Sequence, residues 1–570
     1  MFPRLMILPA VRRWLAGITR LPEILGLRSE LHRVMQLPGA ATGRLRVAAL
    51  GALILGIPTP SQCADPAPPP SVPGTDRSGQ HRIGPETAAT LDAFIVRGMA
   101  DWKIPGLSIV VVKDGVAVYE KGFGVRALGR DGLVDTQTLF GMMSTTKAMT
   151  ALAIALLVDE GKVRWDDPLS KHLPWFRLPN AYLTEHVTVR DALRHTSGME
   201  ESDLLWGRED LTTREILERM RMAPTTDSLR SGWLYQNVLY QAAGEVVVAA
   251  SGLPWERFIA TRILDPLGMT RSSVTHQSMA ARQDSNVSTA HFEIDGKIQA
   301  IEEVVVDRVP AAGGVWTTAH DAGKWMSFWT SGGKVGDRRL VSEAAFAELL
   351  APQAVVRPME SAYPTAGLVG SHWITYGLGW FQQDYRGHFV AMHTGSMDGR
   401  TAIAGLVPEE HLGVYVLGNL DHAEFRHALL WKVIDLWTGA PDRDWNNECL
   451  KLYAGVNAKK QRKDAEREAA RIRDTHPSHP LGAYVGAYGH PAWGRVDVVL
   501  EDGDLTLRIG PSTRLHGRLQ HWHHDTFRTR LGDGRGGWSY VHFDTGQDGA
   551  ITVLHLDDKQ VFSRPQPMNP

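Results

Sequence analysis

Hydrophobic and polar positions in the first part of the folded region follow patterns that predict particular elements. An apolar run from Ala148 to Val158 predicts a buried helix. Residues 107–112 and 116–122 predict two strands, because the Lys-Asp-Gly turn between them is a strong hairpin signal. Residues 87–99 repeat hydrophobic side chains at helical spacing. A helix, a β-hairpin and a buried helix are therefore expected in this order.

The middle of the chain has a different pattern. Helical patches and loops dominate from about residue 166 to 303, and strand signals are scarce there. Strand-like alternation returns beyond this region, at residues 376–383, 388–393, 401–407 and 413–417. The sequence therefore predicts an antiparallel sheet built from about residues 87–165 and 304–440, with a mainly helical subdomain inserted between its two parts.

After residue 440 the character of the sequence changes twice. Residues 441–480 are rich in charged side chains and predict a solvated helix followed by a linker. Residues 481–570 consist of short strands and turns, which favours a small antiparallel β-barrel or sandwich. The run His521-Trp-His-His524 raises the alternative of a metal site. No matching distant ligand pattern accompanies it, so a solvated strand is favoured and no metal is expected.

Composition and charge narrow the functional classes. A chain of 570 residues exceeds one compact core, and its 43% hydrophobic and 22% charged residues are ordinary for globular domains. The net charge of -2 gives no electrostatic footprint for nucleic acid, so the expected partner is a small-molecule or peptide substrate. The two cysteines, Cys63 and Cys449, do not form a disulfide framework.

The N-terminal pattern predicts export. Residues 1–64 are interpreted as an extension and a signal peptide, because the short apolar run 47–57 follows arginines and precedes a cleavage-like sequence at Ala64. Met35 is favoured as the true start. The alternative is that residues 1–34, ahead of Met35, form an uncleaved, basic amphipathic anchor. Besides the signal peptide, this anchor would be the protein's contact with a membrane. Residues 65–86 form a Pro-rich linker. A periplasmic or secreted location is expected.

Ser144-x-x-Lys147 is the first candidate for chemistry. Residues three apart share a helix face, so the lysine would stand beside the serine. A serine at a helix start also has free backbone N–H groups nearby, which can hold an oxyanion. The lysine could then take the hydroxyl proton of a nucleophile. The alternative is a helix-capping serine followed by a surface lysine.

Two further motifs have the residue types that such a nucleophile needs. Tyr235 and Asn237 lie at a loop-to-helix transition, where a phenol can move protons and an amide can bind a substrate carbonyl while fixing the lysine. His393-Thr394-Gly395 lies near the end of a strand, where glycine permits close approach and the following N–H can point into a cleft. The alternatives are an aromatic packing residue with a capping asparagine, and an ordinary strand end with a turn.

The order of these motifs resembles one superfamily. S-x-x-K, then Y-x-N about ninety residues later, then H-T-G near a sheet edge is similar to the serine β-lactamases and penicillin-binding proteins, especially the class C β-lactamase group with its DD-carboxypeptidase, D-aminopeptidase and esterase relatives. The resemblance covers about residues 87–439. It implies an α/β (α+β) β-lactamase/transpeptidase-like hydrolase domain at 87–440, followed by an all-β accessory domain.

The resemblance also implies roles for individual residues. Ser144 would be the acylated nucleophile, with Lys147 and Tyr235 as the proton-transfer pair. Asn237 would contact a substrate amide and Thr394 a substrate carboxylate or its equivalent. The remaining positions implied are His393, Gly395 and Ser396, with the backbone N–H groups of Ser144 and Ser396 as the oxyanion hole.

One position departs from the class C β-lactamases. His393 stands where those enzymes have a lysine, and a mostly neutral imidazole weakens the case for hydrolysis of anionic β-lactams. The expected function is a secreted serine hydrolase of an amide, peptide, lactam or ester that needs neither metal nor cofactor. The alternative is a non-catalytic or slowly deacylating penicillin- or peptidoglycan-binding protein. Whether Lys147 or Tyr235 is the base stays open.

Overall fold

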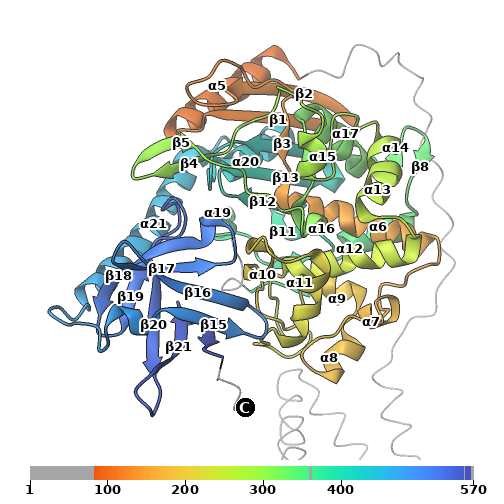
Figure 1. The fold of residues 1–570 in the computed structure, drawn as a ribbon. Coiled ribbons are helices and arrows are strands. Elements are labelled where there is room, and N and C mark those ends of the chain that lie inside the picture. The colour runs from red at the N-terminus through yellow and green to blue at the C-terminus, as the bar shows by residue number, and fades with distance from the viewer. Residues whose placement is uncertain (1–82, 358–362, 558, 566–570) are drawn as a thin grey trace, which may run out of the picture. The chain divides into compact units, whose positions relative to one another are not determined.

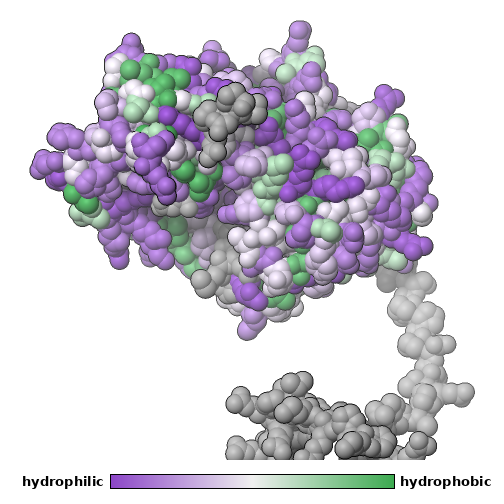
Figure 2. All heavy atoms as spheres, turned by 60° about the horizontal axis from the view of Figure 1, so that its bottom comes forward, coloured by the Kyte–Doolittle hydropathy of each residue, from purple (hydrophilic) through white to green (hydrophobic). Residues whose placement is uncertain are grey.

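The computed structural model describes residues 83–357, 363–557 and 559–565, all of which belong to one compact unit. The expected extension, signal peptide and most of the Pro-rich linker lie outside these residues. None of the helices in these ranges has both the length and the apolar character needed to cross a bilayer. On the face shown in Figure 2, hydrophilic side chains predominate and hydrophobic ones form small separate patches.

The centre of the fold is an antiparallel sheet of eight strands, in the order β2-β1-β14-β13-β12-β11-β10-β9 (Figure 1). Its strands are β1 (Gly106–Lys113), β2 (Val116–Gly124), β9 (Ala354–Val355), β10 (Ile374–Tyr376), β11 (Phe381–Tyr385), β12 (His388–Met397), β13 (Arg400–Val407) and β14 (Leu412–Gly418). Sequence regions from both ends of the hydrolase domain thus meet where β1 pairs with β14.

Helices cover both faces of this sheet. The continuous apolar run of β1 reflects burial on both sides. Ile109 and Val111 pack in the core that contains α5 (Pro85–Asp101) and α20 (Phe425–Thr438). Val110 and Val112 point to the opposite face and pack in a second core. Among the helices that contribute to this second core are α6 (Lys147–Asp159), α12 (Asn237–Ser251), α16 (Pro310–Gly313), α17 (Ala319–Thr330) and α18 (Glu343–Leu350).

A mainly helical region separates the two parts of the sheet, as expected. Its helices are α7 (Leu169–His172), α8 (Ala181–His186), α9 (Val189–Leu193), α10 (Leu204–Gly207), α11 (Thr213–Arg219), α12, α13 (Trp255–Ile259), α14 (Asp265–Leu267) and α15 (His276–Ala280). The structure adds one small hairpin to this region, β4 (His291–Ile294) with β5 (Lys297–Ala300). The short pairs β3 (Phe140–Gly141) with β6 (Trp316–Thr317) and β7 (Lys334–Val335) with β8 (Arg338–Arg339) complete the domain, together with α19 (Thr365–Val369).

The C-terminal part is a closed eight-stranded barrel, which decides between the barrel and the sandwich. Its strands are β15 (Gly486–His490), β16 (Gly494–Glu501), β17 (Asp504–Ile509), β18 (His516–His523), β19 (Thr526–Thr529), β20 (Ser539–Thr545), β21 (Ile551–Leu556) and β22 (Gln560–Ser563). Before it, the charged helix α21 spans Trp445–Ala469. Among the described residues, no group of three or more His, Cys, Asp or Glu side chains is arranged to hold a metal ion.

The expected fold class is confirmed, but one strand assignment is wrong. The segment 376–383 is not a single strand, because β10 ends at Tyr376 and β11 begins at Phe381. Between them Gly379 has φ +89, a conformation that side chains other than glycine rarely adopt. Its backbone packs so close to Ala148 that a Cβ atom would lie 2.9 Å from the Ala148 backbone. The turn therefore brings the sheet against the start of α6.

Candidate active site

Ser144 lies in a 3₁₀ turn rather than in the first turn of an α-helix. The turn spans Met143–Thr146 and passes directly into α6 at Lys147. Met143 has φ 48, which is uncommon for a residue with a side chain. The turn is held at its start, where the Met142 N–H donates to the Val315 carbonyl at 2.7 Å. Such a conformation needs support from its surroundings and is often found at functional sites.

Lys147 is fully buried behind this turn. Its Nζ lies 3.1 Å from Ser144 Oγ and donates to Asn237 Oδ1 at 2.7 Å and to the Ala312 carbonyl at 2.9 Å. Burial lowers the pKa of Lys147 to about 7, although the nearby Asp203 carboxylate opposes this shift. A neutral amine has two N–H groups for the two acceptors. Its lone pair is then free for the Ser144 hydroxyl, as a general base requires.

Tyr235 approaches Ser144 from the loop before α12. Its hydroxyl donates to Ser144 Oγ at 2.9 Å. Burial raises the pKa of Tyr235 well above its usual value, although the Ser144 hydrogen bond opposes the rise. The ring is packed against the buried His195, with 4.4 Å between ring centroids. In the free protein Tyr235 is therefore a fixed phenol donor, and Lys147 is the group prepared to accept a proton.

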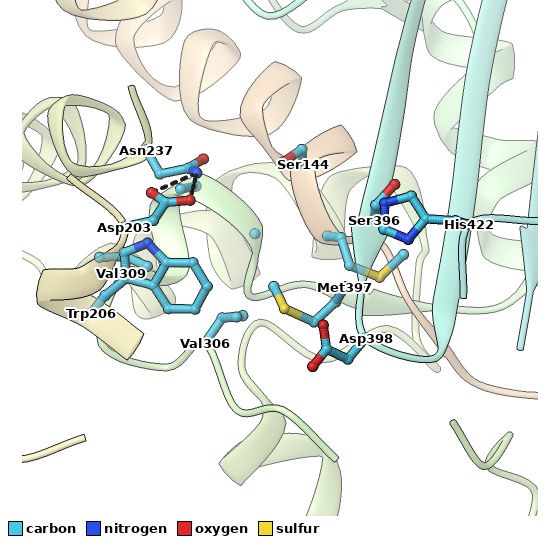
Figure 3. Close-up of a pocket in the computed structure, with 13 residues that line it drawn as sticks. Ser144, Asp203, Trp206, Asn237, Val306, Val309, Ser396, Met397, Asp398 and His422 are labelled. Carbon is cyan, nitrogen blue, oxygen red and sulfur yellow. Dashed lines mark hydrogen bonds between the residues drawn. The ribbon is translucent and has the colours of Figure 1, made fainter. Parts of the chain in front are cut away.

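Asn237 is the first residue of α12 and has both ends of its amide engaged. Its oxygen accepts from Lys147, and its Nδ2 donates to both carboxylate oxygens of Asp203 at 3.0 Å (Figure 3). Asp203, which directly precedes α10, was not among the residues predicted for the site, because no motif marks it. Through Asn237, this carboxylate orients the Lys147 side chain. Contact between Asn237 and a substrate amide stays a prediction.

His393 lies inside the sheet and is neutral. Its Nε2 is 3.0 Å from the Tyr376 hydroxyl, and its Nδ1 is 2.6 Å from the Thr394 carbonyl oxygen. Burial, followed by the charge of Lys147, lowers the pKa of His393 to about 3. The hydroxyl of Thr394 instead reaches the cleft side, 2.7 Å from the Tyr363 hydroxyl. This position of the sheet therefore provides no permanent positive charge for an anionic substrate.

Gly395 lets the β12 edge approach the nucleophile turn. A Cβ atom at this position would lie 2.3 Å from the Met142 carbonyl oxygen and 3.2 Å from the Ser144 nitrogen. Arg426 holds the same edge from α20. Its Nη1 donates to the Gly395 carbonyl at 2.5 Å and to Ser396 Oγ at 2.9 Å. The spacing of motifs gave no signal for Arg426, which acts through these tertiary contacts.

Replacing Gly395 by alanine should lower kcat/KM by roughly 10²-fold, because the new methyl group pushes β12 away from the turn that carries Ser144. The loss of an oxyanion donor has an effect of this size. Steady-state kinetics with a chromogenic ester would measure it. Gly455→Ala is the matched control, since a Cβ there meets nothing within 4 Å. Wild-type kinetics in Gly395→Ala would contradict the close approach.

Ser144 opens into two adjoining pockets of about 260 and 800 Å³. Figure 3 shows the smaller one, with Asp203 and Trp206 on one side of Ser144. Met397 and Asp398 lie on the other side, where β12 ends. The structure thus brings together all eight residues predicted for the site. The side chain of His393 lies behind the pocket wall and does not line either pocket. Their catalytic and binding roles stay predictions.

This arrangement lies within a region of the chain that matches a known family. The beta-lactamase family model matches residues 91–436, and the chain belongs to this family. A second model, described as a domain of unknown function (DUF3471), matches residues 470–569, which include the barrel.

Relatives share about a quarter of their residues with this chain. The unguisins hydrolase ungD of Aspergillus violaceofuscus is 26% identical over 442 residues, covering 71% of this chain and 75% of the relative. The protein flp of Staphylococcus aureus (strain COL) is 25% identical over 346 residues, covering 60% of this chain and 64% of the relative.

Solved structures support the fold. The octameric penicillin-binding protein homologue from Pyrococcus abyssi superposes with a TM-score of 0.53 at 23% identity, covering 83% of this chain and 99% of that one. SurE superposes with a TM-score of 0.50 at 20% identity, covering 84% of this chain and 99% of SurE.

Proposed function

We propose that this protein is a serine hydrolase that cleaves an amide, peptide, lactam or ester through an acyl-enzyme on Ser144. One observation carries the proposal. The Ser144 hydroxyl lies within hydrogen-bond distance of both the buried Lys147 amine, at 3.1 Å, and the Tyr235 phenol, at 2.9 Å. A nucleophile with a base at hydrogen-bond distance, the base itself being oriented by a third group, is the arrangement that covalent catalysis needs. Here the third group is Asn237.

In the proposed reaction the neutral Lys147 takes the proton of Ser144 Oγ as this oxygen attacks the substrate carbonyl carbon. The N–H groups of Ser144 and Ser396 stabilise the oxyanion. The proton then passes from the Lys147 ammonium to the leaving group, directly or through the Tyr235 hydroxyl, and the acyl-enzyme forms. Water attacks next, the acid leaves, and Ser144 regains its proton. Each step uses groups that surround one hydroxyl.

The site and the relatives support a proposal for the substrate class. The neutral His393 favours neutral or cationic substrates over anionic β-lactams. Relatives named as unguisins hydrolases support hydrolysis as the reaction. The N-terminal pattern at residues 47–57 supports a periplasmic or secreted enzyme. We therefore include short peptides, D-amino-acid amides and esters among the proposed small-molecule and peptide substrates.

The experiment is a time course with D-Ala-D-Ala peptides, D-amino-acid p-nitroanilides, short-chain esters and a chromogenic cephalosporin. Steady turnover of any of them supports an enzyme. A slowly deacylating binding protein would release one burst of product and stay acylated. Absence of both turnover and acylation across this panel would overturn the proposal.

The pH dependence of kcat/KM should rise with an apparent pKa of about 7, because Lys147 must lose its proton before it can act as the base. Asp203→Asn removes the charge that raises the pKa of Lys147, so the acidic limb should move to lower pH. Glu201 also lines the larger pocket; its side chain is exposed, and desolvation by the pocket walls followed by the Asp203 charge raises its pKa to about 7. Glu201→Gln should leave the limb in place. If Glu201→Gln shifts or removes the acidic limb instead, the assignment of that limb to Lys147 would be contradicted.

A further inference from the structure

The C-terminal barrel is attached to one wall of the proposed substrate cleft. Arg208 directly follows α10, and its side chain is only 4% exposed. Its Nη1 donates to the carbonyl oxygens of Trp493 at 3.0 Å and Arg495 at 2.6 Å, where β16 begins. The rest of its guanidinium pairs with Asp210 at 3.0 and 2.9 Å. Barrel backbone thus satisfies a buried arginine beside the pocket wall that Asp203 and Trp206 form.

A barrel side chain also reaches the opposite wall. Arg535 lies between β19 and β20, with a side chain 11% exposed, and its Nη1 is 3.3 Å from Asp398 Oδ2. Asp533 aligns the guanidinium through bonds of 2.8 and 2.7 Å and offsets part of its charge, so Asp398 meets a partly screened cation. Asp398 occupies the turn between β12 and β13 and lines the smaller pocket together with Ser396 (Figure 3). The barrel therefore acts on a carboxylate that shares a pocket with the nucleophile.

Acidic side chains dominate the described lining of the two pockets. The acids are Glu200, Glu201, Asp203, Asp398 and Glu424, and the bases are His422 and Arg426. Arg426 is paired with Glu424 at 3.0 Å, so its charge is largely offset. Burial and then the neighbouring Asp421 raise the pKa of Asp398, whereas Arg535, Arg514 and His422 lower it. Arg535 thus favours the ionised form of Asp398 and at the same time offsets the charge of that carboxylate, so the net charge at this end of the cleft depends on a group of the barrel.

We propose that the barrel sets the charge preference of the hydrolase, with Arg535 partly neutralising Asp398 and so limiting how strongly the cleft favours positively charged substrates. The inference rests on the proposed function and assigns a role to the barrel. Arg535 touches no reacting atom and acts through Asp398, so it is a specificity-determining residue and not a catalytic one. The Asp398 carboxylate would attract an ammonium group of the substrate and accept a charge-assisted hydrogen bond from it.

The test compares D-alanine p-nitroanilide, which carries a free ammonium group, with its N-acetylated form, which carries none. Arg535→Ala in the full chain should raise the ratio of kcat/KM for the two substrates about threefold, in favour of the ammonium form, because one partly screened charge is removed near the pocket. The kcat/KM for the acetylated substrate should stay within about twofold. Arg535→Lys keeps the charge and should retain the wild-type ratio.

Two further variants separate electrostatics from loosening of the barrel. Arg530→Ala removes another barrel arginine, 3.5 Å from Asp295, which lines neither pocket, and should not change the ratio. Asp398→Asn should lower the ratio, and adding Arg535→Ala to it should change nothing more. Equal losses for both substrates in Arg535→Ala would overturn the inference while leaving the hydrolase proposal intact. Absence of turnover and acylation in the wild type would overturn both.

Discussion

Replacing Ser144 by alanine should abolish covalent labelling and lower kcat by roughly 10⁴- to 10⁶-fold, since the variant lacks the oxygen that forms the acyl-enzyme. The effect should be chemical rather than structural. Ser144 Oγ lies at the cleft, where it contacts Lys147 and Tyr235, and it supports no core packing. The folded state should therefore survive the change. Residual activity would come from the oxyanion donors and substrate binding alone.

Intact-protein mass spectrometry after exposure to a fluorophosphonate or a labelled penicillin would detect the adduct, and a chromogenic ester would give kcat. Ser251→Ala is the matched control, because its hydroxyl donates to the Val247 carbonyl at the end of α12 and lines neither pocket. That variant should label and turn over like the wild type. A stoichiometric adduct on Ser144→Ala would place the nucleophile elsewhere and refute the assignment.

The sequence was sufficient to predict those parts of the site that depend on the spacing of neighbouring residues. Ser144 and Lys147 are three residues apart, so a helical turn alone brings their side chains together. The Tyr235 hydroxyl reaches the same oxygen although 91 residues separate it from Ser144. Only the order of motifs made that convergence predictable. The physical reason is that the buried α6 and α12 helices pack against each other in one core.

The residues that the sequence did not reveal act across tertiary contacts. Asp203 reaches Lys147 through Asn237, and Arg426 holds Gly395 from a helix that begins 30 residues later. Neither lies at a spacing that a motif specifies. The pKa of Lys147 was equally inaccessible, because it depends on burial by residues distant in the chain. The same holds for the barrel, whose strands and barrel-like fold were predictable but whose contact with Asp398 was not.

The base could not be assigned from the sequence, and the geometry now favours Lys147 over Tyr235. Lys147→Met should therefore lower the rate of acylation by roughly 10³-fold, within the range for loss of a general base. Methionine fills much of the same buried volume and adds no charge. It leaves Asn237 Oδ1 and the Ala312 carbonyl without their donor, so some loss of stability is expected as well. A melting curve shows whether the variant is folded under assay conditions.

Stopped-flow measurement of acylation across pH separates the two roles. If Lys147 is the base, Lys147→Met should lose the acidic limb near pH 7 as well as the rate. Tyr235→Phe keeps the ring beside His195 and should slow the reaction while preserving that limb, because the raised pKa of the phenol keeps it protonated throughout this range. A Lys147→Met enzyme that retains both limb and rate would exclude the amine as the base. The proton would then have to leave Ser144 Oγ through Tyr235, its other hydrogen-bonded neighbour.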